Sequence, residues 1–252
     1  MKRTLLIFLC TAVMAVLFIP AAHAQGFQSH YEWGISAGVL LYQGDLTPEK
    51  LGASKTMKFA MGLQACKILG PSFSIRAQLL RGSLKGDDSK YAHPDYRQQR
   101  NFKFSTPVTE LSMQFVWNLR ANNDADKGFA PYLFAGGGLS FLKIKRNWSG
   151  INPTFFNVES SSAVWTGLAA DTLQNLPRVI PVIPVGAGIK YFLNPHWALN
   201  IESSYRFSNT DYLDGFSKSV NPNKNDHYVN YQVGIAYRQG KTDRLKCPRV
   251  KY

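Results

Sequence analysis

Residues 107–119, PVTELSMQFVWNL, show a two-residue alternation that decides the fold class. Apolar side chains take the odd positions and polar ones the even positions: Leu111, Met113, Phe115 and Trp117 alternate with Glu110, Ser112, Gln114 and Asn118. Successive side chains of a β-strand point to opposite faces of the sheet, so the stretch predicts a strand with one apolar and one polar face.

The same alternation recurs along most of the chain. Seven further strands are predicted at 31–44, 57–69, 73–86, 131–145, 182–193, 197–210 and 227–239, and only a short stretch near 162–176 is compatible with a helix. The polar faces consist mainly of Gly, Ser and Gln with a few charges. A sheet face in water is usually richer in Lys, Glu and Thr, so this composition favours a crowded interior.

The connections between these strands alternate strictly in length. Three are short (70–72, 120–130 and 194–196) and four are long (45–56, 87–106, 146–181 and 211–226). Short periplasmic turns and long extracellular loops are typical of outer-membrane barrels. We therefore expect an all-β fold, an eight-stranded antiparallel transmembrane β-barrel. Trp33, Trp117 and Trp197 would lie on its apolar face near the periplasmic boundary, where amphipathic rings are favoured; core aromatics of a soluble β protein are the alternative.

Composition and the N-terminal residues limit the protein class further. The 252 residues are 45% hydrophobic and 13% aromatic, too apolar for a disordered chain, and 3 Cys are too few for a disulfide-rich miniprotein. Lys2 and Arg3 precede an apolar stretch that ends at Ala22-His23-Ala24, which is typical of a secretory signal peptide. We expect a signal peptide at 1–24, a barrel at 25–240 and a basic periplasmic tail at 241–252. Cleavage near Ala24 would deliver the chain to the outer membrane of a Gram-negative bacterium.

Six charged residues fall on the polar face. The acids are Glu32, Glu110 and Glu202, and the bases are Arg76, Lys190 and Arg206. Eight strands enclose a space that side chains fill, so we expect a closed polar lumen in which these charges pair. A gated ion path through the same residues is the alternative.

Catalytic, metal and cofactor sites are not indicated. His30 and His196 are expected at the periplasmic boundary, His93 in a loop, and His227 at the start of the last strand with the wrong parity for the lumen. Strand parity places no Ser or Asp beside any of them. Asp87-Asp88 and Asp124-Ala125-Asp126 are interpreted as solvated turns, and Gly136-Gly137-Gly138 as a point of barrel curvature. We therefore expect no enzyme activity, no catalytic residues, no metal, no cofactor and no small-molecule substrate.

The C-terminal tail concentrates positive charge. Arg244, Lys246, Arg249 and Lys251 follow the last strand, with Asp243 as the single acid from Arg238 onward. Nucleic acid is not available in the periplasm, so an acidic partner surface, lipid headgroups or the cell wall are the candidate targets. A flexible solubilising tail is the alternative. Cys66 and Cys247 would meet oxidising conditions and are able to pair, although spacing does not determine the connectivity.

Four stretches resemble one known family. The first runs from Tyr31-Glu32-Trp33-Gly34 through Tyr42-Gln43-Gly44-Asp45-Leu46, and the second from Arg97 to Leu111, with Arg100-Asn101-Phe102-Lys103-Phe104 and Thr109-Glu110-Leu111. The third is Trp165 to Pro177 followed by Ile183-Pro184-Val185-Gly186-Ala187-Gly188-Ile189-Lys190-Tyr191, and the fourth is Thr210-Asp211-Tyr212-Leu213-Asp214-Gly215-Phe216-Ser217. They resemble PorG-like outer-membrane barrels of the Bacteroidetes over essentially the whole chain after residue 24. Gly215 stands where that family has Asp.

This resemblance implies an outer-membrane protein of the type IX secretion and gliding machinery that associates with periplasmic ring proteins. We expect a non-enzymatic accessory or scaffold component that contacts outer-membrane lipid and docks periplasmic partners. A small-solute channel or transporter is one alternative. A surface-binding barrel, acting through loop aromatics at Tyr91, Phe155, Phe156 and Trp165, is another. We expect these aromatics to pack together over the barrel mouth instead.

Overall fold

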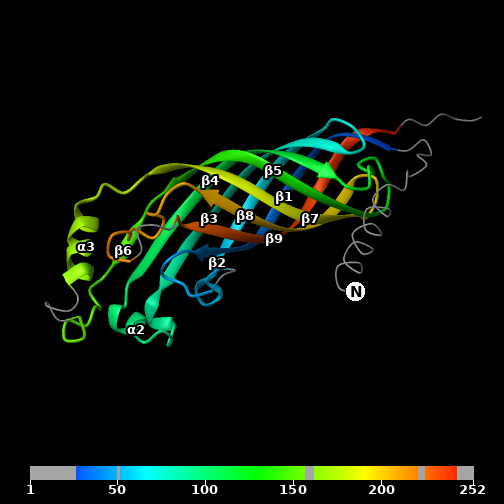
Figure 1. Ribbon diagram of the computed structural model, residues 1–252. Helices are drawn as coiled ribbons and strands as arrows, with labels where there is room; N and C mark the ends of the chain where they lie inside the picture. The colour runs from blue at the N-terminus through cyan, green and yellow to red at the C-terminus, as the bar shows by residue number, and fades with distance from the viewer. Residues whose placement is uncertain (1–26, 50–51, 157–161, 221–224, 243–252) are drawn as a thin grey trace, which may run out of the picture.

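Eight antiparallel strands close into a barrel in the computed structural model, which describes residues 27–49, 52–156, 162–220 and 225–242 (Figure 1). The barrel strands are β1 (Phe27–Gln43), β2 (Lys58–Ile68), β3 (Phe73–Asp87), β4 (Lys103–Asn118), β5 (Gly128–Leu142), β7 (Val179–Phe192), β8 (Trp197–Ser208) and β9 (His227–Thr242). The sheet order is β3-β2-β1-β9-β8-β7-β5-β4, and pairing of β3 with β4 completes the ring. All eight predicted strands are present, and the fold-class prediction is confirmed.

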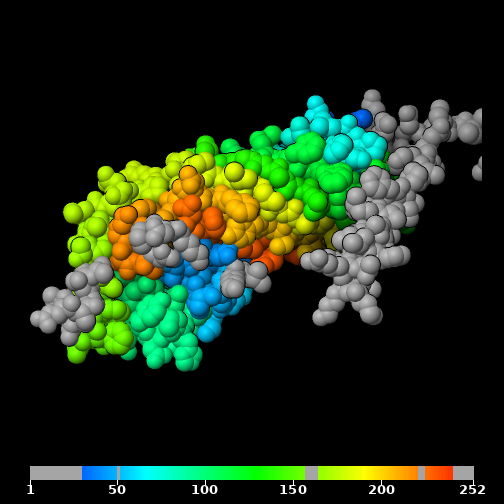
Figure 2. Space-filling view, viewed as in Figure 1, coloured from blue at the N-terminus to red at the C-terminus, as the bar shows by residue number. Residues whose placement is uncertain are grey.

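The two ends of the barrel differ. One end, here called the turn end, carries the short connections 69–72, 119–127 and 193–196 and the pairing of Phe27 with Thr242. The opposite loop end carries the connections 44–57, 88–102, 143–178 and 209–226, whose described parts lie against one another in the space-filling view (Figure 2).

The loop end also contains the remaining short elements. They are η1 (Ser54–Thr56), η2 (Asp88–Lys90), α2 (Tyr96–Arg100), α3 (Ser162–Leu173) and β6 (Lys145–Asn147), which extends the sheet beside β4. The predicted helix near 162–176 corresponds to α3. Among the described residues, no helix has the length and apolarity needed to cross a membrane.

The outward side chains form an apolar surface around the barrel. In-register rows run across β3, β4 and β5, for example Phe73–Trp117–Leu133. Ile201 is 65% exposed and Phe59 63%, and a continuous outer surface of such side chains is typical of a protein that contacts hydrocarbon. The exposed rings of Trp33, Trp117 and Trp197 lie toward the turn end, together with those of Tyr31, Tyr191 and Tyr237. This arrangement is that of a transmembrane barrel with an aromatic girdle.

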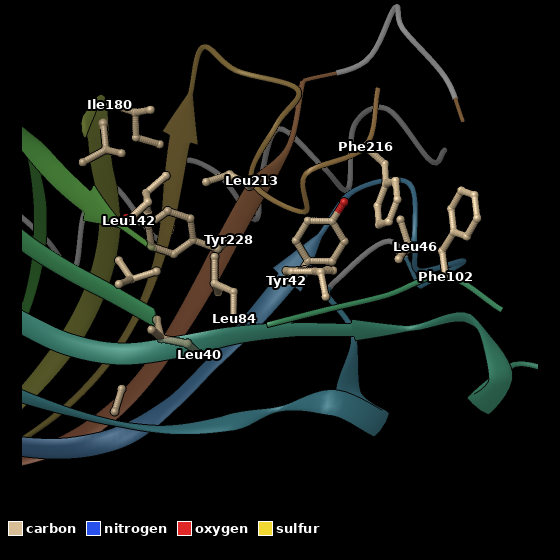
Figure 3. Packing of buried hydrophobic residues seen from close by; sticks show 14 of the residues in the cluster. Leu40, Tyr42, Leu46, Leu84, Phe102, Leu142, Ile180, Leu213, Phe216 and Tyr228 are labelled. Atoms are coloured by element: carbon tan, nitrogen blue, oxygen red, sulfur yellow. The ribbon is translucent and has the colours of Figure 1, made fainter. Parts of the chain in front are cut away.

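The interior changes character along the barrel axis. Toward the loop end, buried apolar side chains fill it: Leu40, Tyr42, Leu46, Leu80, Leu84, Phe102, Val108, Leu142, Ile180, Val182, Leu213, Phe216 and Tyr228 (Figure 3). The expectation of a polar lumen was therefore wrong for this half. The inward positions of several strands are apolar there, as at Leu40, Leu84 and Ile180, and the loops add further apolar groups. Only the half nearer the turn end has a polar interior.

Candidate functional site

The polar half of the lumen starts at the turn end with Glu32 on β1. Its carboxylate lies 2.5 Å from Nζ of Lys190 and 3.4 Å from Nε of Arg238. Arg238 donates to the carbonyl oxygen of Ala125 at 2.8 Å and to that of Asn123. Its guanidinium lies 4.2 Å from the ring centre of Phe192. These contacts bind the 119–127 turn to the barrel wall and close the lumen at this end.

Arg238 is the lumen residue whose role sequence reasoning missed. The parity of the last strand placed it on the polar face, but its charge was counted with the tail. It is fully buried in the structure. The carbonyl oxygens that bind it lie in a turn whose position cannot be read from strand alternation.

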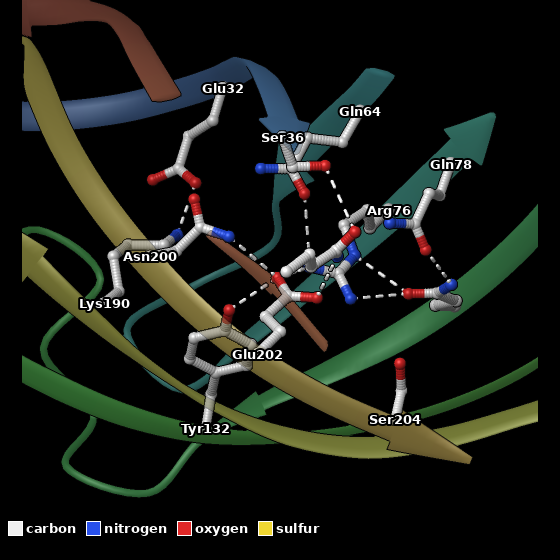
Figure 4. A network of polar contacts seen from close by, with 12 residues as sticks. Glu32, Ser36, Gln64, Arg76, Gln78, Tyr132, Lys190, Asn200, Glu202 and Ser204 are labelled. Carbon is white, nitrogen blue, oxygen red and sulfur yellow. Dashed lines mark hydrogen bonds and ion pairs between the residues drawn. The ribbon is translucent and has the colours of Figure 1, made fainter. Parts of the chain in front are cut away.

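Arg76 and Glu202 form the next layer (Figure 4). Arg76 Nη1 lies 2.5 Å from Glu202 Oε1, and Arg76 Nε donates to Gln114 Oε1 at 2.9 Å. Glu202 also accepts from the hydroxyl of Tyr132 at 2.6 Å and from Nε2 of Gln232 at 2.8 Å. Because both charges are buried, this dense set of donors and acceptors is what offsets their desolvation.

The third layer joins Glu110 and Arg206 beneath the apolar half. Arg206 Nε lies 3.2 Å from Glu110 Oε2, which also accepts from the hydroxyl of Tyr228 at 2.8 Å. Arg206 also donates to Ser204, and the Tyr228 hydroxyl lies 2.7 Å from Ser140 Oγ. The structure thus brings the six charged residues selected from the sequence together as three ion pairs, one in each layer.

Little empty space remains between these layers. A cavity of about 20 Å³ lies beside Glu32, Cys66 and Glu202. A volume of roughly 10–15 Å³ holds one water molecule, so this space admits water and no larger solute. The thiol of Cys66 is buried beside it. Cys247 lies outside the described residues, and its pairing with Cys66 stays a prediction.

A cluster of acids lies at the loop end around the hydroxyl of Tyr42. That hydroxyl is 2.7 Å from Asp214 Oδ2 and 2.6 Å from Asp226 Oδ1, and it accepts from the backbone N–H of Asp45 at 2.9 Å. Burial raises the pKa of both Asp214 and Asp226 well above the usual range, and for Asp226 the nearby Asp214 charge adds to the effect. Burial also raises the pKa of Asp211 to about 6. One phenolic proton serves only one carboxylate, so the geometry favours a proton on the other carboxyl group, which then donates to the Tyr42 oxygen.

Asp171 on α3 fastens the 143–178 loop to the 209–226 loop. Its carboxylate accepts from the backbone N–H groups of Ser217, Lys218 and Ser219 at 3.2, 3.0 and 3.0 Å. It also accepts from Ser219 Oγ at 2.7 Å. A carboxylate that satisfies several backbone donors makes strong charge-assisted bonds, so the two loops form one cap.

The loop aromatics and Gly215 belong to the same cap. The indole N–H of Trp165 donates to the carbonyl oxygen of Phe156 at 2.8 Å, and Tyr91 is buried. Gly215 has φ +84°, a conformation that favours glycine, and its carbonyl oxygen accepts from Arg146 at 2.7 Å. Trp165 and Phe155 both contact Phe156, whereas Tyr91 contacts Thr47 and Lys55, and Phe155 remains 51% exposed.

The interpretation of Asp87-Asp88 as a solvated turn was wrong. Asp88 is fully buried and accepts from Arg97 at 3.1 Å and from Arg100 Nε at 2.7 Å. Both arginines come from α2, so this ion pair fixes the 88–102 loop. The local sequence resembles an exposed turn because its partners follow nine and twelve residues later.

The remaining candidate residues lie apart from the lumen. His93 lies 3.6 Å from Asp95 in an exposed loop, His196 stacks on Tyr237, and His227 packs near Phe207. Among the described residues, no group of three or more His, Cys, Asp or Glu side chains is arranged to hold a metal ion. Arg244, Lys246, Arg249 and Lys251 lie outside the described residues.

A family model described as "Domain of unknown function (DUF6089)" matches residues 8–241. The chain belongs to the DUF6089 family. No curated protein matches this DUF6089 chain in sequence.

Solved barrels resemble this DUF6089 chain in fold. Ail, the attachment invasion locus protein of Yersinia pestis, shares 9% identity over 84% of this chain and 99% of its own, with a TM-score of 0.42. OprG from Pseudomonas aeruginosa shares 12% over 87% and 100%, with a TM-score of 0.43. The outer membrane enzyme PagL shares 13% over 81% and 97%, with a TM-score of 0.40. At such low similarity, the activity of this chain has to be argued from its own residues.

Proposed function

We propose that this protein is a non-enzymatic scaffold of the outer membrane, an accessory part of the type IX secretion and gliding machinery that docks periplasmic partners. The observation that carries the proposal is the closed lumen. Three layers of paired charge and an apolar half fill it, the Arg238 contacts cover the turn end, and packed loops cover the loop end. The surfaces of the protein are then the parts available for function.

The secretion role is supported by the resemblance to PorG-like barrels. The stretch at Thr210–Ser217 contributes Asp214 to the cluster around Tyr42, which itself lies in the first resembling stretch. Two of the four stretches therefore meet in one structural unit. Hydrogen bonds and side-chain packing stabilise this unit, and a rigid structural unit is what a scaffold protein requires.

If the protein docks periplasmic partners, the surface that binds them is the turn end, which would face the periplasm. The basic tail, with Arg244, Lys246, Arg249 and Lys251, follows β9 in the sequence. β9 ends at the turn end, where Arg120 and Lys127 of the 119–127 turn are exposed. Positive charge of this density favours an acidic protein surface. Periplasmic ring proteins of the secretion machinery are the proposed partners.

Affinity purification from native membranes tests this proposal. An affinity tag inserted within 157–160 leaves the tail free, and the same preparation is repeated with Arg244, Lys246, Arg249 and Lys251 all changed to Gln. A matched control changes four loop-end lysines, Lys55, Lys90, Lys145 and Lys218, to Gln. We expect ring proteins to co-purify with the wild type and the control and to be lost from the tail variant. A barrel that purifies alone in all three preparations would contradict the proposal.

A small-solute channel is less well supported, because three layers of paired charge and the apolar half fill the lumen of the described barrel. Planar-bilayer conductance of the purified protein tests that alternative directly. A surface-binding role has one observation in its favour, the exposed side chains of Phe155 and Leu173 on the cap. Retention of ring-protein binding after Phe155→Ser and Leu173→Ser would separate the scaffold role from binding by this surface.

A further inference from the structure

The outward face of β3, β4 and β5 changes from apolar to basic toward the loop end. Leu79, Leu111 and Leu139 pair in register and form the last wholly apolar row. The next three rows are Arg81–Thr109–Phe141, then Ser83–Pro107 with Lys143 beside it, and then Lys85–Ser105–Lys145. We call Arg81, Lys85, Lys143 and Lys145 the basic ladder.

The four cations of the basic ladder are available to a ligand. Arg81, Lys143 and Lys145 are exposed, and Lys85 is half-buried. Within the described residues, none of their side chains forms a salt bridge or a side-chain hydrogen bond, whereas the neighbouring Lys103 lies 3.9 Å from Asp87. The three rows that carry the ladder contain no acid. Their positive charge is therefore not neutralised locally.

The basic ladder occupies one side of the barrel. The outward positions at the loop end of β8, β9 and β1 are Tyr205, Phe207, His227, Val229, Val39 and Leu41. Those positions include no Lys or Arg. Exposed loop-end cations such as Lys55, Lys58 and Lys218 lie outside these outward rows. The one-sided placement along the outward strand positions therefore indicates a specific surface.

The position of the basic ladder along the membrane normal indicates which kind of partner it contacts. Adjacent rows are about 7 Å apart along a strand, and strand tilt shortens this spacing along the membrane normal. The ladder therefore starts at the edge of the apolar surface and continues outward, where lipid headgroups lie. Lys85 and Lys145 are two strands apart, or roughly 10 Å. That separation lets two cations contact one phosphorylated headgroup.

We propose that the basic ladder binds the phosphate groups of anionic lipids in the membrane leaflet at the loop end. The lipid is held by charge at the headgroup and by the apolar row of Leu79, Leu111 and Leu139 along its chains. Each Lys or Arg near an anionic membrane surface is attracted to it electrostatically. This binding surface is independent of the secretion role, because it lies at the end opposite the proposed docking surface.

Native mass spectrometry of the full mature protein in detergent micelles tests the proposal. The protein is titrated with dimyristoyl-phosphatidic acid and, separately, with dimyristoyl-phosphatidylcholine. The ladder variant changes Arg81, Lys85, Lys143 and Lys145 to Gln. A control of equal charge change replaces the exposed Lys67, Arg120, Lys127 and Lys218 with Gln. Heat-modifiable migration on gels verifies that each variant folds.

We expect phosphatidic acid to bind the wild type and the control at least about tenfold more tightly than the ladder variant, with phosphatidylcholine equal in all three. Equal binding of phosphatidic acid by wild type and ladder variant would overturn the proposal. An equal loss in the control would also overturn it, because net charge would then account for the binding. Displacement of the lipid by inorganic phosphate at matched concentration would show a free-phosphate site in place of a lipid site.

Discussion

Arg76 and Glu202 are 126 residues apart in the chain, yet Arg76 Nη1 and Glu202 Oε1 lie 2.5 Å apart in the middle of the barrel. The sheet order places β3 four strands away from β8, so the pair joins opposite walls of the eight-stranded ring. Backbone hydrogen bonds connect only neighbouring strands. This ion pair therefore connects parts of the barrel that the sheet itself does not.

The first prediction concerns this cross-barrel pair. Arg76→Met leaves the buried Glu202 carboxylate without its counter-charge, and breaking a buried pair costs about 3–5 kcal/mol of folding free energy. Urea unfolding in lipid vesicles, followed by tryptophan fluorescence, measures the loss. Adding Glu202→Leu removes the orphaned charge and should restore most of the stability. Arg120→Met, at an exposed position, should change the unfolding free energy by less than about 0.5 kcal/mol.

The second prediction concerns the closure of the turn end by Arg238. Arg238→Met keeps an apolar group over Phe192 but removes the donors to Asn123 and Ala125. The 119–127 turn should then separate more easily from the wall, and trypsin should cleave faster after Arg120 and Lys127. Lost hydrogen bonds of this charged type are worth about 1.5–3 kcal/mol each. Lys67→Met, which is exposed on β2, should leave the cleavage rate unchanged; equal acceleration would contradict the closing role of Arg238.

Alternation along single strands was sufficient to predict the barrel and the inward-facing charges. Parity alone put Glu32, Arg76 and Glu202 on one face, because each side chain of a strand has only two directions available. Alternation could not predict which of these charged residues pair with one another. The pairing of Glu32 with Lys190 depends on the order of the strands and on their stagger around the ring.

The loop end was predicted poorly for a related reason. Its contacts join loops that are distant in sequence, such as Asp171 with Ser219 and Asp214 with Tyr42. No periodicity in the local sequence identifies a carboxylate that accepts hydrogen bonds from a different loop. Asp88 illustrates the difficulty, because an Asp in a polar loop is usually solvated. Here Asp88 is buried because Arg97 and Arg100 of α2 pack against it and pair with its carboxylate.

The third prediction is that the loop end is more stable in mild acid than at neutral pH. The pKa values of Asp214 and Asp226 are raised in the folded protein, so the folded state binds protons that the unfolded state releases. Their stabilising contribution is complete below the ordinary carboxyl pKa of about 4 and is lost as the pH rises through the folded pKa values. Asp211, with a pKa of about 6, adds a decline in that region. Urea midpoints measured across this range should fall with increasing pH.

Asp226→Asn provides the matched test of that pH dependence. An amide imitates the protonated acid, since its oxygen can accept from the N–H of Leu213 while its NH₂ donates to the hydroxyl of Tyr42. The variant should be more stable than the wild type at neutral pH, and its midpoint should depend less on pH. Tyr42→Phe should make the protein less stable than the wild type at neutral pH, because it removes the hydroxyl that hydrogen-bonds to two buried acids. An unchanged pH profile in Asp226→Asn would rule out this cluster as the cause.

The fourth prediction uses the depth of two outward residues on β4. Met113 lies in a wholly apolar part of the outer surface, whereas Thr109 pairs with Arg81 in the first row of the basic ladder. An Arg on the lipid face costs about 2–4 kcal/mol at the midplane and about 0–1 kcal/mol near the interface. Met113→Arg should therefore lower the free energy of unfolding in lipid vesicles by the larger amount, and Thr109→Arg should lower it by the smaller amount. The two variants share a strand, a face and an added charge, so only membrane depth separates them. Equal losses would contradict the membrane position assigned to the apolar surface, and with it the headgroup position of the basic ladder.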